Sequence, residues 1–179
     1  MLHAPISYHA LDSPLGPMIA GATERGLCFL EWTDRGGTET ILRRVEKRYQ
    51  AELIGADTPN AHLRSLTEEL QRYFAGELRG FTIPIDVYGS PFQRAVWSQL
   101  LKIPYGETRS YQQIAAALDK PDAVRAVGAA NGSNYLSIVI PCHRVIGADG
   151  SLTGYGGKVW RKKRLLELEA GVTQEIIAA

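Results

Sequence analysis

The stretch that decides the fold of the C-terminal half reads SYQQIAAALDKPDAVRAVGAANG, residues 110–132. Ser110 is a candidate helix N-cap, and Ile114 and Leu118 follow it at helical spacing. The polar residues 119–122 indicate a turn, and Pro121 stands where a second helix would begin. Two short helices joined by a tight turn predict a helix-turn-helix, although this spacing is also common in helical proteins that bind no DNA.

Further helices are predicted on both sides of this stretch. Ser90 is a candidate N-cap with Pro91 at the first helical position, ahead of an apolar stripe. A last helix is predicted over residues 158–170, with a run of basic residues at its start. Glu167 and Glu169 lie near its end, where the helix dipole disfavours carboxylates. At least one of them is therefore expected to have a specific cationic partner.

The first half predicts a small α/β unit. The expected order is two strands that suggest a hairpin, two amphipathic helices and a third strand, at residues 15–20, 26–32, 38–49, 60–74 and 81–87. Residues 88–90 read as a linker. We therefore expect an α/β (α+β) chain of two domains, residues 1–86 and 87–179.

The composition excludes several classes of protein. The chain has 179 residues, 45% of them hydrophobic and 22% charged, which suits one or two small globular domains. Its longest apolar run, residues 138–142, is far shorter than the ~18 residues that a membrane span needs. No basic region followed by an apolar stretch opens the sequence, so no signal peptide is expected. Two cysteines form no disulfide framework, which favours a reducing cytoplasm.

The charge is distributed unevenly. Residues 1–86 contain nine basic and twelve acidic side chains, a net charge of −3, whereas residues 87–179 contain eleven and seven, a net charge of +4. The basic half favours contact with a polyanion, but a solvated surface also carries a charge of this size.

The two cysteines have different surroundings. Cys28 lies in an apolar run and reads as a buried structural thiol. Cys142 follows Pro141 and a predicted buried strand, residues 137–140, and precedes His143. A thiol attacks as the thiolate, and a neighbouring base or cation raises the ionised fraction. Adjacent residues of a strand point to opposite faces, so pairing with His143 requires a turn at Pro141 or a bridging water. A buried Cys-His pair without chemistry remains an alternative at this point.

The motifs resemble those of the O6-alkylguanine-DNA alkyltransferases, also called methylated-DNA–protein-cysteine methyltransferases. They occur in family order and at family spacing, and are FQ at 92–93, VW at 96–97, IPYGET at 103–108, SY at 110–111, RAVG at 125–128, ANGSN at 130–134, IPCHRV at 140–145, VIG at 145–147 and GYGG at 154–157. The resemblance is strong over residues 90–170 and weaker elsewhere. It implies a ribonuclease H-like N-terminal domain and a mostly helical, winged-helix-like C-terminal domain containing the helix-turn-helix.

The resemblance also implies residue roles. Cys142 would accept the alkyl group, His143 would act as its base through a water, and Glu169 would hold the imidazole. Asn134 would brace the active-site turn, and Tyr111 would donate a proton or a hydrogen bond toward N3 of the leaving guanine, whose anion is a poor leaving group.

The partner implied is double-stranded DNA containing alkylated guanine, bound through the minor groove with the damaged nucleotide turned out of the stack. Arg125 would fill the vacated place, and Gln112 and Lys120, together with Tyr111, would contact DNA. The pocket wall would be formed by Val145, Tyr155, Gly156 and Gly157. A monomer is expected, with cooperative binding along DNA left open.

One departure from the family concerns Tyr135, which stands where many members have a proline. Losing that proline removes a rigid turn, so the shape of the pocket and the rate of reaction are expected to differ. No cofactor is expected, because no nucleotide-binding motif is present. No metal site is expected either, because His3, His9, Cys28 and His62 lack the paired short spacing of zinc ligands.

Three other functions compete with single-use alkyl transfer. An alkyltransferase-like protein binds alkylation damage without repairing it, but such proteins lack the acceptor cysteine. Family members that regulate transcription carry a further N-terminal module. A Cys-His hydrolase would turn over many times, whereas an alkyl acceptor stops after one event.

Overall fold

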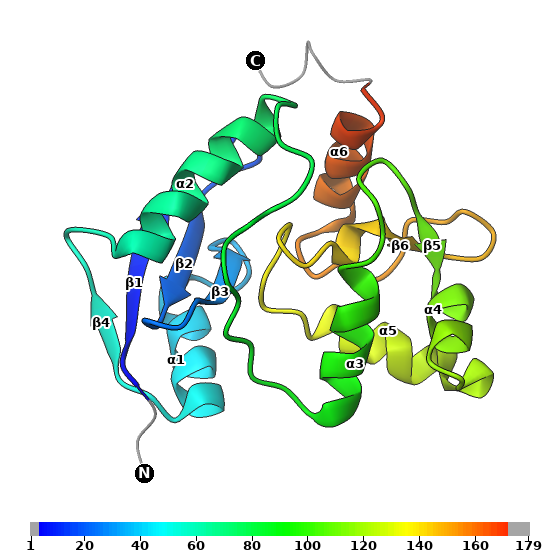
Figure 1. Cartoon of the computed structure of the whole chain (residues 1–179), viewed down its shortest axis with the longest axis horizontal. Helices are drawn as coiled ribbons and strands as arrows, with labels where there is room; N and C mark the ends of the chain where they lie inside the picture. The colour runs from blue at the N-terminus through cyan, green and yellow to red at the C-terminus, as the bar shows by residue number, and fades with distance from the viewer. Residues whose placement is uncertain (1–3, 172–179) are drawn as a thin grey trace. The chain divides into compact units, whose positions relative to one another are not determined.

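The computed structural model describes residues 4–171, and the chain forms two compact units, Met1–Tyr88 and Gly89–Ala179 (Figure 1). Unit 1 is built on a four-stranded sheet in the order β3-β2-β1-β4. Strands β1 and β4 pair in parallel, whereas β1 with β2 and β2 with β3 pair antiparallel. The strands are β1 (Ile6–Leu11), β2 (Met18–Ala22), β3 (Leu27–Trp32) and β4 (Leu53–Gly55).

The two helices predicted in this unit are confirmed as α1 (Thr38–Tyr49) and α2 (Ala61–Phe74). Helix α1 buries Ile41 and Val45, which share one face because they are four residues apart. Helix α2 begins after Asn60, whose side chain accepts a hydrogen bond from the third residue of the helix, and it packs across β1 and β2 (Figure 1). The predicted hairpin of β2 and β3 is also confirmed.

The strand predicted over residues 81–87 is wrong. Only a single bridge forms there, between Ile85 and Leu27. Pro84 has no N–H to donate to a ladder, so the segment pairs at one point and then leaves the sheet. Strands β1 and β4 were not predicted: β1 mixes apolar and polar residues, and β4 is only three residues long.

Unit 2 is mostly helical. Its elements are α3 (Pro91–Leu100), β5 (Arg109–Ser110), α4 (Tyr111–Ala117), η1 (Pro121–Ala123), α5 (Val124–Gly132), η2 (Cys142–Arg144), β6 (Val145–Ile146) and α6 (Val159–Glu169). Helices α3 and α4 each pack against α5, and β5 pairs with β6 in parallel (Figure 1). The α4–η1–α5 segment confirms the predicted pair of short helices, with a 3-10 turn at Pro121 before the second.

The sequence predicted the start of two helices correctly. Ser90 and Ser110 both form capping boxes, in which the serine side chain accepts from the third helical N–H and a glutamine at that position returns a hydrogen bond. These reciprocal hydrogen bonds give partners to backbone N–H groups at the start of each helix, which have no acceptor within the helix. Ser110 therefore fixes the start of α4, of which Tyr111 is the first residue.

The strand predicted over residues 137–140 is also wrong. The segment is a buried turn, in which Ile140 N–H donates to Leu136 O at 3.0 Å and Ile138 has a φ of 72°. A short buried apolar run can be a strand or an irregular segment, and periodicity does not separate the two. The backbone groups of Leu136 and the carbonyl oxygen of Ile140 form hydrogen bonds with the Asn134 side chain, instead of with a neighbouring strand.

No helix among residues 4–171 has the length and apolar character required to cross a lipid bilayer.

Candidate active site

Cys142 is the first residue of η2, directly after the buried turn, and is 5% exposed. The Asn134 side chain ties the turn together. Its Nδ2 donates to Ile140 O at 2.9 Å and Leu136 O at 3.2 Å, and its Oδ1 accepts from Leu136 N–H at 2.9 Å. The same Nδ2 lies 3.1 Å from Sγ of Cys142. Asn134 therefore fixes the backbone that presents the sulfur and also offers the sulfur a hydrogen bond.

His143 and Glu169 form a fully buried pair. Nε2 of His143 lies 2.7 Å from Oε1 of Glu169, and neither side chain has measurable exposure. Burial lowers the pKa of His143, and its hydrogen bond to Glu169 only partly opposes this, so the imidazole is neutral at pH 7. Burial raises the pKa of Glu169, but the hydrogen bonds from His143 and Arg144, together with the charge of Arg144, outweigh it and hold the pKa at about 2. An ionised carboxylate only accepts, so Nε2 of His143 carries the proton.

The other ring nitrogen of His143 is then a basic lone pair. Nδ1 is buried and has no hydrogen-bond partner among the described residues. A buried acceptor without a donor costs free energy. The ring is thus held by Glu169 in the tautomer that leaves Nδ1 available to take a proton.

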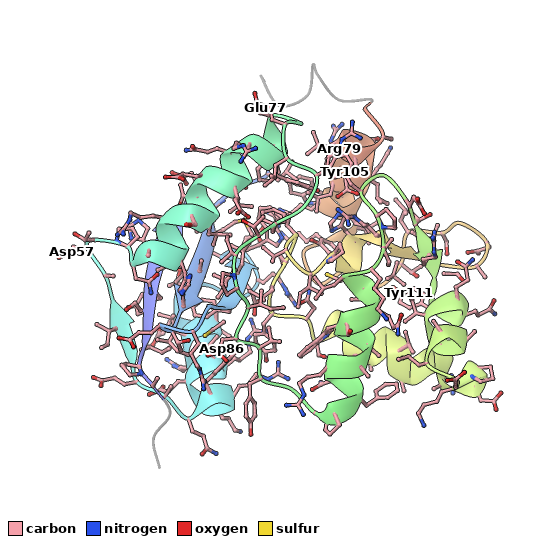
Figure 2. All side chains as sticks on the ribbon, in the orientation of Figure 1. Asp57, Glu77, Arg79, Asp86, Tyr105 and Tyr111 are labelled. Carbon is pink, nitrogen blue, oxygen red and sulfur yellow. The ribbon has the colours of Figure 1, made fainter. Side chains whose placement is uncertain are left out.

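The resemblance implies that the His143 imidazole is the cationic partner expected for Glu169, but the cation is Arg144. Its Nε and Nη2 donate to the two carboxylate oxygens at 2.8 and 2.9 Å, and its Nη1 donates to Ile103 O at 2.7 Å. Gly106 N–H donates to the same carboxylate at 3.1 Å. Tyr105, labelled in Figure 2, extends to the end of α6, and its ring centroid lies 5.8 Å from the guanidinium of Arg144. Glu169 therefore joins α6 to the loop after α3 and to η2.

Lys162 is a buried cation that the sequence did not predict. Its side chain on α6 has no exposed surface, and its ammonium donates to Thr153 O at 2.8 Å and to Val145 O. Burial lowers its pKa to about 8, and the nearby Cys142 works against that shift. The basic run of residues 161–164 reads as a solvated helix start, but Arg161 and Lys162 face inward with Leu165. Their spacing of three and four residues from Leu165 was the available signal.

Tyr111 stands at the start of α4 (Figure 2), with its hydroxyl donating to Thr153 O at 3.1 Å. Thr153 O therefore accepts from both Tyr111 and Lys162. A Cβ on the next residue, Gly154, would lie 3.1 Å from the Tyr111 hydroxyl, and Gly154 has a φ of +67°. Both the close approach and the left-handed backbone favour glycine there.

The structure brings together some of the predicted residues. Asn134 contacts Cys142 and Glu169 contacts His143, and the two pairs are joined because Cys142 and His143 are consecutive in η2. Of the predicted pocket wall, Val145, Tyr155 and Gly157 are buried and Gly156 is exposed. The predicted DNA contacts Gln112, Lys120 and Arg125 are all exposed on the α4–η1–α5 segment. Small exposed residues, Ala126 and Ala129, accompany Arg125 on α5.

Among residues 4–171, no three His, Cys, Asp or Glu side chains are grouped so that they would hold a metal ion. His3 lies outside the described residues. Cys28 lies in β3, and burial raises the pKa of its thiol to about 11. The reactive features of the described chain are therefore concentrated around Cys142.

Comparison with known proteins gives a consistent result over both units. Residues 91–171 match the DNA-binding domain of 6-O-methylguanine DNA methyltransferase, and residues 6–87 match the ribonuclease-like domain of the same protein. Methylated-DNA–protein-cysteine methyltransferase of Mycobacterium tuberculosis is 46% identical over 165 residues, covering 92% of each chain. The constitutive enzyme of Bacillus subtilis is 44% identical over 168 residues, covering 90% of this chain and 94% of its own. A crystal structure of Mycobacterium tuberculosis OGT in complex with DNA aligns with a TM-score of 0.81 at 42% identity, covering 96% of this chain and 97% of that one.

Proposed function

Because the chain belongs to the 6-O-methylguanine DNA methyltransferase family, we propose that it repairs DNA directly, by moving the alkyl group from O6 of guanine to the sulfur of its own Cys142. The observation that carries this proposal is the environment of that sulfur. Cys142 is followed in η2 by a neutral histidine held by an ionised carboxylate, and a side-chain amide donor lies 3.1 Å from the sulfur. A neighbouring base and a hydrogen-bond donor to sulfur both favour the thiolate, which supports this proposal.

The first step is removal of the thiol proton. His143 takes it at Nδ1 through a bridging water, and Glu169 stabilises the imidazolium that forms. Arg144 keeps Glu169 ionised throughout. Asn134 donates to the thiolate, and the Lys162 ammonium, which interacts electrostatically with Cys142, offsets its negative charge.

The transfer itself is an in-line displacement. The S–C bond forms as the C–O6 bond breaks, and the electron pair of the broken bond goes to the purine. Tyr111 donates a hydrogen bond or a proton at N3, which makes the guanine a better leaving group. The product is a thioether, and no group in the described site is arranged to hydrolyse it, so each chain acts once.

The damaged base reaches Cys142 only after leaving the duplex, which costs a few kcal/mol. We propose that α5 enters the minor groove, where the exposed alanines beside Arg125 allow close approach and Arg125 occupies the vacated place in the stack. Gln112 and Lys120 would contact the phosphates. Val145, Tyr155, Gly156 and Gly157 would line the pocket, with the glycines leaving room for the purine. Because the minor groove carries a degenerate code, binding should be largely independent of sequence.

The proposed substrates are O6-alkylguanine and O4-alkylthymine in double-stranded DNA. The reaction uses only this chain's own side chains and needs no cofactor. A monomer acting in the cytoplasm is proposed, and the presence of Cys142 favours repair over the damage-binding function of alkyltransferase-like proteins.

The experiment compares the two cysteines of the chain. Duplex DNA carrying methyl-tritiated O6-methylguanine is incubated with the wild type, Cys142→Ser and Cys28→Ser. We expect label on the wild type and on Cys28→Ser, and none on Cys142→Ser, which should still bind DNA. Label retained by Cys142→Ser would contradict the proposal.

A further inference from the structure

Asn131 is a buried polar residue beside Cys142 that the mechanism above does not use. It lies on α5 and is 2% exposed. Its Nδ2 donates to the backbone oxygen of Cys142 at 3.4 Å. Its Oδ1 is also buried and has no hydrogen-bond partner in the part of the chain that the structure describes. A buried amide with an unpaired oxygen is less favourable than an apolar side chain of the same shape, so core packing does not account for an asparagine at this position.

The Cys142 carbonyl fixes the orientation of this amide. A carbonyl oxygen only accepts, so the amide nitrogen of Asn131 faces it and the amide oxygen is directed elsewhere. The same carbonyl also accepts the backbone N–H of Val145, so both of its lone pairs are occupied. Nδ1 of His143 is already assigned to the thiol proton. Oδ1 of Asn131, one hydrogen bond away from Cys142, is therefore an acceptor still open to a group of the substrate.

The position of Asn131 on α5 relates it to the base edge that Tyr111 addresses. A Cβ added to Gly128 would lie 4.0 Å from carbon atoms of the Tyr111 ring, so this ring lies against α5. Asn131 follows Gly128 by three residues, which places both on one side of the helix. Tyr111 is proposed to donate to N3 of the everted purine. The group expected to meet Asn131 is therefore one close to N3.

The chemistry of the lesion identifies that group. Alkylation of O6 leaves N1 of guanine without a proton, so the ring nitrogens N1, N3 and N7 can only accept. The 2-amino group is then the only N–H donor of the base, and it is bonded to C2, the carbon next to N3. O4-alkylthymine has no N–H donor, because its N3 also loses its proton on alkylation. An open acceptor in the site can thus pair with the guanine lesion and not with the thymine lesion.

We propose that Oδ1 of Asn131 accepts a hydrogen bond from the 2-amino group of the everted guanine, and that it thereby favours O6-alkylguanine over O4-alkylthymine. This inference rests on the proposed function. With guanine in the site, the buried oxygen gains the partner that it lacks in the free protein. With thymine in the site, the oxygen stays unpaired, and a site that leaves a buried polar group unpaired discriminates against that substrate.

The test removes the two partners of this hydrogen bond separately. Single-turnover methyl transfer is measured on duplexes containing O6-methylguanine, O4-methylthymine or O6-methylhypoxanthine, in which a C–H replaces the 2-amino group. The wild type is compared with Asn131→Leu, which has a similar size and no acceptor. A general loss of activity through poorer folding would slow all three transfers by the same factor. Ser98→Ala on the exposed face of α3 is the control and should leave all three rates unchanged.

Loss of one hydrogen bond to the reacting base corresponds to about a tenfold slower transfer. We expect Asn131→Leu to slow transfer from O6-methylguanine by about that factor and to slow transfer from the other two bases by less than about twofold. The preference of the wild type for guanine over each of them should therefore shrink by about tenfold in the variant. Asn131→Ala, for which the same change in preference is expected, serves as a second variant if the leucine prevents folding.

Two results would overturn the inference and leave the proposed function intact. Equal slowing on all three bases would mean that Asn131 only supports the fold of the site. Unchanged transfer from O6-methylguanine would mean that its oxygen does not bind the 2-amino group. Failure of the wild type to accept a methyl group from O6-methylguanine would instead refute the proposed function, and this inference with it.

Discussion

Replacing Glu169 with glutamine tests the buried centre of unit 2. The carboxylate accepts from His143, from two nitrogens of Arg144 and from the Gly106 N–H. An amide in its place leaves the Arg144 guanidinium, whose side chain is 9% exposed, without its counter-charge. Removing one partner of a buried ion pair costs about 3–5 kcal/mol.

The pKa of Glu169 gives a similar magnitude. The folded value of about 2 lies below the ordinary 4.5. At ~1.4 kcal/mol for each pKa unit, this difference corresponds to about 3 kcal/mol. Because the folded pKa is depressed, this stability is fully present above pH 4.5 and is lost as the pH falls toward 2. We therefore expect Glu169→Gln to lower the free energy of unfolding of unit 2 by about 3 kcal/mol at pH 7 and to differ less from the wild type near pH 3.

The assay is urea unfolding followed by tryptophan fluorescence in a Trp32→Phe background, so that Trp97 and Trp160 report on unit 2. Glu167→Gln is the matched control on the same helix. Glu167 makes partly exposed ion pairs with Lys163 and Arg164, which are worth about 0–1 kcal/mol. If Glu169→Gln costs no more than Glu167→Gln at pH 7, the reasoning about the buried centre is refuted.

Three further predictions concern the surroundings of Cys142 and the proposed DNA contact of α5. Asn134→Ala removes three hydrogen bonds to the backbone and the donor to Sγ, and should slow transfer by about 100-fold or more, measured as a single-turnover rate on an O6-methylguanine duplex. A loss below about threefold would contradict the proposed role. The Lys162 ammonium, with a pKa of about 8, should lose its proton as the pH rises through that value. The transfer rate of the wild type should therefore fall above pH 8, and the rate of Lys162→Met should not. An identical fall in both proteins would exclude Lys162 as its source. Arg125→Ala should weaken base eversion, measured by 2-aminopurine fluorescence beside the lesion, more than it weakens binding to undamaged duplex, whereas equal losses would indicate a phosphate contact only.

The sequence predicted the parts of the fold that local rules determine. The capping boxes at Ser90 and Ser110 depend on residues three positions apart, and helix α1 depends on the spacing of its apolar side chains. Strand β1 was missed because it mixes polar and apolar residues and is stabilised by pairing with both β2 and β4. The turn over residues 137–140 was mistaken for a strand because its backbone is satisfied by Asn134, which no periodicity reveals.

The sequence likewise predicted those site residues that local patterns identify and missed those identified only by contacts in the fold. Cys142, His143 and Asn134 stand within a few residues of one another, and the position of Glu169 at a helix end already required a cation. That this cation is Arg144 became clear only from the structure. Lys162 was missed because its charge indicates a solvated surface, although its spacing of three residues from Leu165 placed it on the buried face of α6.

The central claim is that one sulfur accepts one alkyl group and is consumed. Intact-mass measurement after incubation with an excess of O6-methylguanine duplex, followed by peptide mapping, tests it most directly. We predict a single added methyl group on every active chain, located on the peptide that contains Cys142, with one lesion repaired per chain. Repair of several lesions by one chain, or complete repair with Cys142 unmodified, would contradict the account.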